Sequence, residues 1–398
     1  MKTTLSLQPA LTQSTLPARP RVGIVYRMER AGGVQSCALA LIRALNRRGI
    51  VPDILWDTPP APRLLAEAGA RAGFRRIPLR IGSRLSDRLP YTLRYLANVA
   101  NAVDGAAFSA EYDFFFVFYN GFLLPPDAPH VRYLSGPPLV PQLAQISPGV
   151  RGLPVRLFRW LYARLLRRKF PVYEFHRGSN YVINSQFTAA LFEQAHGLAL
   201  PVISPPIAIP ARGFEDDDWP RRDTLTFFSR IIDYKRPHLA LELARAAPRL
   251  RCVIMGSVPP HRRAYFESLQ ARARALGLER VIFLDTPSNE RVRAELARTR
   301  YYFFPAHNEH FGMTTVEAIA AGALPYVHDS GGQREIVPDD RLRFTDEQML
   351  ARFEQLMRLP EAEVNRIRRA LFDHIGQFSE SVFADKMLTL MEQAIPNL

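Results

Sequence analysis

Short apolar runs alternate along the chain with longer segments whose apolar residues recur at helical spacing. A helical pattern over residues 36–49, closed by Gly49, lies between the first two runs, and a second helix begins at Gln186. The apolar runs that predict buried strands in the first half lie at residues 21–26, 50–56, 112–120, 130–136 and 180–185. Strands that alternate with helices in this way indicate a parallel sheet with helices on both faces.

A proline-rich stretch with an acidic cluster, residues 201–223, interrupts this pattern and is typical of an interdomain linker. The pattern then starts again, and the loop at residues 330–337 comes before terminal helices. The strands predicted in this half are residues 224–230, 250–257, 280–285, 301–306 and 324–329. The fold class is therefore α/β, with two Rossmann-like domains at residues 21–200 and 224–378 that face each other across a cleft.

Composition is that of a soluble globular protein, with 47% hydrophobic and 23% charged residues. No run of 18 apolar residues predicts a transmembrane helix, and residues 1–20 are typical of a flexible tail without a signal peptide. The two cysteines, Cys37 and Cys252, fall in different domains, which favours a reducing, cytoplasmic setting.

The net charge of +14 indicates attraction to anionic partners such as phosphates, lipids or nucleic acid. No nucleic-acid-binding motif is present, and the charge is spread along the chain, so we expect no nucleic-acid partner. Residues 154–171 combine a stripe of leucines with arginines on the opposite side. Such a helix suits the anionic inner face of the cytoplasmic membrane, and it equally suits a surface helix packed on its own domain.

Polar residues that could carry chemistry follow the strands of the second half, where ligands of parallel sheets bind. Arg230 and Lys235 come directly after its first strand, five positions apart. Two cations that converge there would suit a diphosphate, because both neutralise phosphate oxygens.

The stretch "NEHFGMTTVEAIAAG" (308–322) holds two carboxylates, Glu309 and Glu317, on either side of a predicted helix start. We expect Thr314 or Thr315 to cap this helix and its free backbone N–H groups to bind an anion or hydroxyls. The carboxylates could form an acid/base pair, accept hydrogen bonds from vicinal hydroxyls, or simply cap a loop or pair with a nearby arginine.

In the first half, Gly32 and Gly33 follow the first strand but lack the full dinucleotide-binding spacing. They could let the backbone approach a phosphate or an acceptor, or they could form an ordinary tight turn.

Together these segments resemble the family 4 retaining glycosyltransferases, which have the GT-B fold and use sugar nucleotides. The similarity rests chiefly on "FFSRIIDYKRP" and on the E-x7-E segment with its following Gly-Gly loop, "NEHFGMTTVEAIAAGALPYVHDSGGQREIV". The segments "AGGVQ", "NYVINSQFTAALF" and "ISPPI" agree with it, and the last two are most similar to members that extend mannose-containing, lipid-linked glycans.

The resemblance implies that Arg230 and Lys235 hold the donor diphosphate and stabilise the leaving group. It implies that Glu309 binds the donor sugar, together with the segment Phe311, Gly312, Met313 and Thr314, and that Glu317 binds the ribose. Asp285 and Thr286 would border the base, and Gly33 would approach the diphosphate. It further implies that a final helix, residues 379–398, packs back on the first domain.

The resemblance also implies a retaining transfer of a hexose such as mannose from a GDP- or UDP-sugar to a glycan or lipid-linked acceptor, with no metal and no cofactor. Gly32, Asn120 and Ser135 would lie on the acceptor side; Ser135 stands where related sequences carry a histidine. A non-catalytic sugar-nucleotide-binding protein and a GT-B epimerase or phosphorylase are the alternatives, although no lysine is placed as a pyridoxal anchor.

Overall fold

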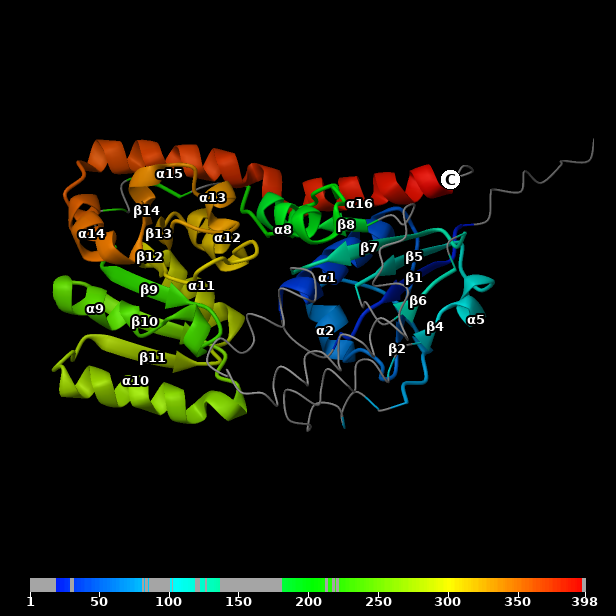
Figure 1. Cartoon of the computed structure of the whole chain (residues 1–398), viewed down its shortest axis with the longest axis horizontal. Coiled ribbons are helices and arrows are strands. Elements are labelled where there is room, and N and C mark those ends of the chain that lie inside the picture. Colours follow the sequence, from blue (N-terminus) through cyan, green and yellow to red (C-terminus); the bar gives the residue numbers. More distant parts are fainter. Residues whose placement is uncertain are drawn as a thin grey trace, which may run out of the picture.

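The protein consists of two α/β halves that lie side by side in the computed structural model (Figure 1). The structure describes residues 19–28, 32–80, 82, 85, 101, 103–118, 122–125, 127–136, 181–211, 214–216, 219 and 222–395. Asn120 and residues 154–171, which the sequence marks as an acceptor-side residue and a membrane-facing helix, lie outside these described residues. Within the described part of the chain, no helix has the length and apolar character needed to cross a membrane.

The first half is a six-stranded parallel sheet in the order β3-β2-β1-β5-β7-β8. Its central strands are buried along their whole length because they are almost entirely apolar. The strands are β1 (Val22–Val25), β2 (Asp53–Trp56), β3 (Gly73–Arg76), β5 (Phe114–Val117), β7 (His130–Leu134) and β8 (Tyr181–Ile183). The other elements are α1 (Gly33–Arg47), α2 (Pro62–Glu67), α5 (Ala106–Ser109), α8 (Gln186–His196) and the small pair β4 (Val103–Asp104) and β6 (Phe122–Leu123).

The second half repeats this topology in the order β11-β10-β9-β12-β13-β14. The strands are β9 (Thr224–Phe228), β10 (Arg251–Gly256), β11 (Val281–Asp285), β12 (Thr299–Phe304), β13 (Leu324–His328) and β14 (Arg343–Phe344). The helices are α9 (Leu239–Ala246), α10 (Arg263–Ala275), α11 (Asn289–Ala297), α12 (Met313–Ala320), α13 (Gln333–Ile336), α14 (Met349–Met357) and α15 (Glu361–Ile375). The predicted fold class, two Rossmann-like domains with parallel sheets, is confirmed.

Two local features differ from the sequence expectation. β3 carries the mostly exposed sequence "GFRR", so no apolar run marks it, and it is held by backbone pairing with β2. The expected loop at residues 330–337 contains the helical turn α13.

The chain crosses between the halves twice, and the two crossings lie next to each other. Ile207 on the first crossing pairs with Ser379 on the second, and its N–H donates to the Phe378 carbonyl at 2.9 Å. The final helix, α16 (Glu380–Ala394), then packs along α1 of the first half (Figure 1). Its apolar face, including Phe383 and Met387, is part of the core of that half.

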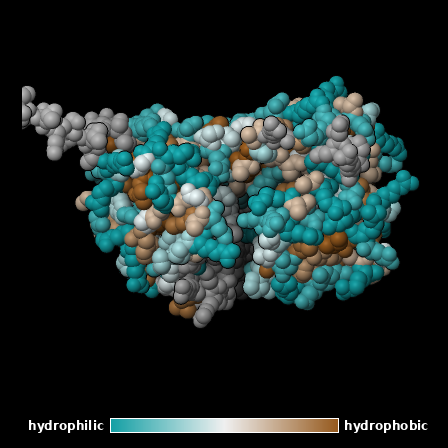
Figure 2. All heavy atoms as spheres, turned by 180° about the vertical axis from the view of Figure 1, so that it is seen from behind, coloured by the Kyte–Doolittle hydropathy of each residue, from teal (hydrophilic) through white to brown (hydrophobic). Residues whose placement is uncertain are grey.

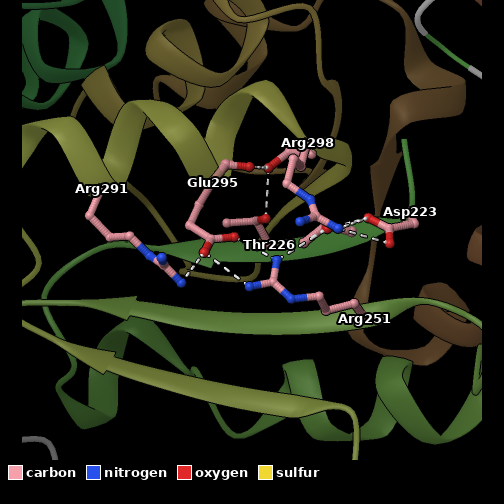
Figure 3. A network of polar contacts seen from close by, with 8 residues as sticks. Asp223, Thr226, Arg251, Arg291, Glu295 and Arg298 are labelled. Atoms are coloured by element: carbon pink, nitrogen blue, oxygen red, sulfur yellow. Dashed lines mark hydrogen bonds and ion pairs between the residues drawn. The ribbon is translucent and has the colours of Figure 1, made fainter. Parts of the chain in front are cut away.

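A charged network closes the amino-terminal edge of the second sheet (Figure 3). Arg251 at the start of β10 holds the Glu295 carboxylate through two hydrogen bonds, of 2.5 and 2.9 Å. Arg291 reaches the same carboxylate at 2.7 Å. Glu295 is only 3% exposed, so its charge depends on these partners for stability.

We expect Glu295→Ala to lower the free energy of unfolding by about 3 kcal/mol, because it leaves a largely buried arginine without its anion. Glu354→Ala is the matched control, since it removes an exposed helical pair with Arg358 worth about 0.5 kcal/mol or less. Urea unfolding followed by tryptophan fluorescence measures both variants. Equal losses in the two would show that burial adds nothing to the Glu295 pair.

Candidate functional site

The candidate residues gather where the starts of two helices from different halves meet. A Cβ atom added to Gly33, at the start of α1, would lie 2.5 Å from the Met313 sulfur at the start of α12. Both helices direct the positive end of their dipole toward this junction. The space-filling view shows a furrow between the two halves (Figure 2). The backbone alone therefore gives a positive potential to the junction of the two helix starts.

Lys235 and Glu309 form a buried ion pair at the carboxyl ends of β9 and β12. Their side chains are only 10% and 17% exposed, and Lys235 Nζ donates to Glu309 Oε2. The ammonium group also lies 5.2 Å from the centre of the Phe304 ring. Burial would raise the pKa of Glu309, but the charge and the hydrogen bond of Lys235 hold it below its ordinary value. The ion pair thus favours the ionised form of the Glu309 carboxyl group.

Arg230 stands beside this pair but stays exposed. Its Nη2 donates to the Tyr234 hydroxyl at 3.0 Å, and Tyr234 itself is 61% exposed. Tyr234 belongs to the same 3-10 turn as Lys235. The structure therefore places both predicted cations in one loop, with the guanidinium open to solvent and the ammonium buried.

The start of α12 differs from the predicted cap. Gly312 is the N-cap residue, in a left-handed conformation (φ 114°) with the buried Gln333 amide packed against its Cα. The expected threonine cap is wrong, because Thr314 bonds the Tyr302 hydroxyl at 2.7 Å and Thr315 donates to Gln333 Oε1 at 2.9 Å. Among the described residues, no acceptor bonds the backbone N–H groups of Gly312, Met313 or Thr314. These donors remain available to a ligand.

Glu317 lies one turn into α12 and is half-buried. Burial raises its pKa to about 7, and none of the described residues donates a hydrogen bond to its carboxyl group. Glu309 and Glu317 therefore differ in protonation. Lys235 favours the ionised form of Glu309, whereas Glu317 has a pKa of about 7.

Asp285 and Thr286 follow β11 and are bound to their own surroundings. The Asp285 carboxylate accepts from Arg263 at 2.6 Å, from the Thr286 hydroxyl at 2.8 Å and from the Val258 N–H at 3.3 Å. Burial would raise the pKa of Asp285, but the hydrogen bonds from Thr286 and Arg263 keep it low. The three hydrogen bonds to Asp285 therefore fix the shape of this loop.

The predicted acceptor-side residues of the first half that the structure describes follow the inner strands β1 and β7. Gly32 is the exposed N-cap residue of α1, and Ser135 is an exposed residue directly after β7. The Ser135 carbonyl accepts from the Asn184 amide at 3.0 Å. Phe311, predicted as a donor-site residue, has its ring in the core against Phe378, at 5.2 Å between ring centres.

Two glycines that the sequence marks only by resemblance shape the site directly. A Cβ atom on Gly331 would lie 2.5 Å from the Glu309 carbonyl oxygen, and one on Gly332 would lie 2.5 Å from the His310 carbonyl oxygen. The Gly332 N–H donates to the Glu309 carbonyl at 2.7 Å. The glycines let the two loops touch backbone to backbone, which fixes the position of Glu309.

One group of metal-ligand residues occurs in the described part of the chain, where the sequence pattern shows none. His307, His328 and Asp346 have their ligand atoms within 4.8 Å of one another. Arg236 donates to Asp346 Oδ1 at 2.7 Å and lies against His307. A guanidinium group thus already neutralises the carboxylate, so this cluster fits an arginine-centred network better than a divalent ion.

Comparison with known proteins places this site in a family context. Residues 215–370 match the family described as glycosyl transferases group 1. The D-inositol 3-phosphate glycosyltransferase of Kineococcus radiotolerans is 35% identical over 130 residues, which are 30% of this chain and 29% of that protein. The lipopolysaccharide core biosynthesis mannosyltransferase LpcC of Rhizobium leguminosarum is 28% identical over 147 residues, 36% of this chain and 41% of that protein. The chain spans less than half of the length of these curated relatives.

Solved structures with the same fold cover nearly the whole chain. HepE from Anabaena, in complex with UDP and glucose, aligns with a TM-score of 0.66 and 17% identity over 96% of this chain and 100% of that one. Sucrose-phosphate synthase from Thermosynechococcus elongatus aligns with a TM-score of 0.70 and 15% identity, again over 96% and 100%. The predicted GT-B arrangement is confirmed by this similarity.

The raised pKa of Glu317 predicts a pH-dependent loss of stability. A carboxyl group with a pKa of about 7 when folded and 4.5 as its ordinary value binds more protons in the folded state, so stability falls as the pH rises from 4.5 to 7. The neutral Glu317→Gln variant should therefore be more stable than the parent protein at pH 8, by about 1 kcal/mol after allowing for solvent.

Thermal unfolding at pH 8 and pH 4.5 measures this difference, which should nearly vanish at the lower pH. Glu290→Gln on the exposed surface is the control for the charge change. A gain of equal size at both pH values would contradict the assignment.

Proposed function

We propose that this protein is a glycosyltransferase, because residues 215–370 match the glycosyl transferases group 1 family and the chain has the GT-B fold. It would move a hexose from a nucleotide sugar to an acceptor hydroxyl. The observation that carries the proposal is the buried Lys235–Glu309 pair beside the open helix start of α12. A cation, a carboxylate and free N–H donors in one furrow suit a sugar diphosphate.

The diphosphate would bind between Arg230, Lys235 and the helix starts of α1 and α12. Lys235 is held next to Glu309, so its ammonium could turn toward a phosphate oxygen with little loss of pairing. Arg230 is exposed and can reach the phosphates from the solvent side. Electrostatic stabilisation of the departing diphosphate would then supply most of the catalysis.

The sugar and the nucleoside would bind to the two carboxylates separately. Glu309 is ionised and would accept hydrogen bonds from the hexose hydroxyls. Glu317, one turn further along α12, would accept from the ribose hydroxyls, which favour its ionised form. Asp285 and Thr286 would border the base through the loop that they shape.

We propose a retaining transfer on one face of the sugar. The bond from the anomeric carbon to the phosphate oxygen breaks, and its electron pair stays on the diphosphate. The acceptor oxygen bonds to the same carbon on the same face, and the acceptor proton passes to the departing phosphate oxygen. No cofactor beyond the nucleotide sugar enters this proposal, because the cationic side chains meet the leaving-group charge.

The donor and acceptor classes rest on similarity. The HepE structure contains UDP and glucose, and LpcC is named as a mannosyltransferase, so we propose a GDP- or UDP-hexose donor. A glycan or lipid-linked acceptor, with the enzyme on the cytoplasmic face of an anionic membrane, agrees with the net charge of +14. Gly32 and Ser135 would lie on the acceptor side of the furrow.

We expect Lys235→Ala and Glu309→Ala each to lower kcat by about 100-fold or more, because each removes a group aimed at the leaving group or the sugar. The assay is nucleotide release from UDP-, GDP- and ADP-hexoses with candidate lipid-linked acceptors. Lys386→Ala, which removes an exposed lysine of α16, should keep full activity.

Each single variant leaves a buried charge unpaired, so the double variant Lys235→Met, Glu309→Gln serves as the folding control. It should unfold at a temperature near that of the parent protein and remain inactive. Normal turnover in both alanine variants would refute the assignment. Nucleotide binding without transfer to any acceptor would favour a sugar-nucleotide-binding protein instead.

A further inference from the structure

The start of α8 in the first half is held by a carboxylate from the second half. The Glu335 carboxylate, in the short helix α13, accepts from the N–H of Gln186 at 3.0 Å and from the N–H of Phe187 at 2.8 Å. These N–H groups are the first two of an eleven-residue helix, where the helix dipole favours an anion. Two charge-assisted hydrogen bonds therefore join the halves at one point.

The same helix start also holds the loop that carries Glu309. The Ser185 hydroxyl donates to the His310 carbonyl at 2.5 Å, and the Thr188 hydroxyl reaches the same oxygen at 3.4 Å. His310 directly follows Glu309, so the hydrogen bonds to its carbonyl also restrict the position of Glu309, the candidate sugar-binding residue. The loop is thus bound on one side by Gly332 and on the other by the first half.

These contacts lie on the same side of the interface as the chain crossings. The Glu335 carbonyl oxygen is 2.7 Å from Nε2 of His374, in the helix that leads into the second crossing. Phe378 on that crossing packs against Phe311, in the loop that carries Glu309. At the Gly33–Met313 approach, by contrast, the described residues pack closely and form no hydrogen bond or ion pair between Gly33 and Met313. Among the described residues, the hydrogen bonds between the halves therefore lie on the side of the crossings.

We propose that Glu335 is a positioning residue that fixes the angle between the two halves. This inference rests on the proposed function. Because the side chains proposed to hold the nucleotide sugar, Arg230, Lys235, Glu309 and Glu317, already belong to one half, Glu335 should affect nucleotide affinity little. It fixes where the first half, with Gly32 and Ser135, stands relative to the donor sugar.

A carboxylate suits this task because both of its oxygens can accept at once. An amide at this position keeps a single acceptor oxygen and no charge, and alanine keeps neither. Loss of the Glu335 carboxylate leaves the crossings and the α16 packing in place. The halves therefore stay joined, but the angle between them is no longer fixed. A misplacement of about 1 Å at the reacting atoms costs on the order of 100-fold in rate.

The test compares Glu335→Ala and Glu335→Gln with Glu361→Gln, an exposed glutamate at the start of α15 that controls for charge. We expect kcat to fall about 100-fold in the alanine variant and about 10-fold in the glutamine variant. The dissociation constant for UDP or GDP should stay within about twofold of the parent value, because the side chains proposed to hold the nucleotide belong to the second half.

A distance measurement reports the angle between the halves independently of catalysis. Val51 and Leu276 are exposed residues of the first and second halves, and both native cysteines are buried. Labels on Val51→Cys and Leu276→Cys should therefore be site-specific. The distribution of distances between the labels should broaden in Glu335→Ala and stay narrow in Glu361→Gln.

Three results would overturn the inference: an unchanged distance distribution in Glu335→Ala, an unchanged kcat, or a loss of nucleotide affinity that follows a fall in melting temperature. The last result would indicate a merely structural role. If the parent protein binds nucleotides but transfers no hexose, the proposed function fails. The distance and nucleotide measurements would then still decide whether Glu335 fixes the angle between the halves.

Discussion

The buried pair of Lys235 and Glu309 is the interaction on which the site depends. Neither charge could remain in a furrow with so little exposure without the other, because desolvation of a lone ion costs several kcal/mol. The pair requires the ends of β9 and β12 to be neighbours, and the strand order of the second sheet makes them so. The sheet topology is therefore what brings together two residues that lie 74 positions apart.

Close backbone packing holds this pair in place. Gly331 and Gly332 allow one loop to lie directly on the backbone of the Glu309 loop, and Gly312 lets α12 begin against the Gln333 amide. Side chains at these positions would push the loops apart and move the carboxylate away from Lys235. The glycines thus contribute only by lacking a side chain, which lets the loops lie close enough for Glu309 to reach Lys235.

Local patterns explain which parts the sequence could predict. Buried parallel strands are short, nearly continuous apolar runs, so β1, β5 and β9 are visible in the sequence. Arg230, Lys235 and Glu309 can then be placed after strands by counting. β3 is missed because its side chains are exposed and only backbone bonds hold it. The threonine cap on α12 is wrongly predicted because distant groups, the Tyr302 hydroxyl and Gln333, compete for the hydroxyls. The Glu335 contact spans about 150 positions and leaves no local signal.

The two halves contribute different residues to the candidate site. Under the proposed function, the side chains that would meet the charge of a diphosphate and the hydroxyls of a sugar come from the second sheet, and the first half adds only the start of α1 to the donor site. The position of the first half depends on an interface whose hydrogen bonds include those of Glu335, Ser185 and the paired crossings. Donor binding would therefore depend mainly on charge within one half, and alignment of donor and acceptor on hydrogen bonds between the halves.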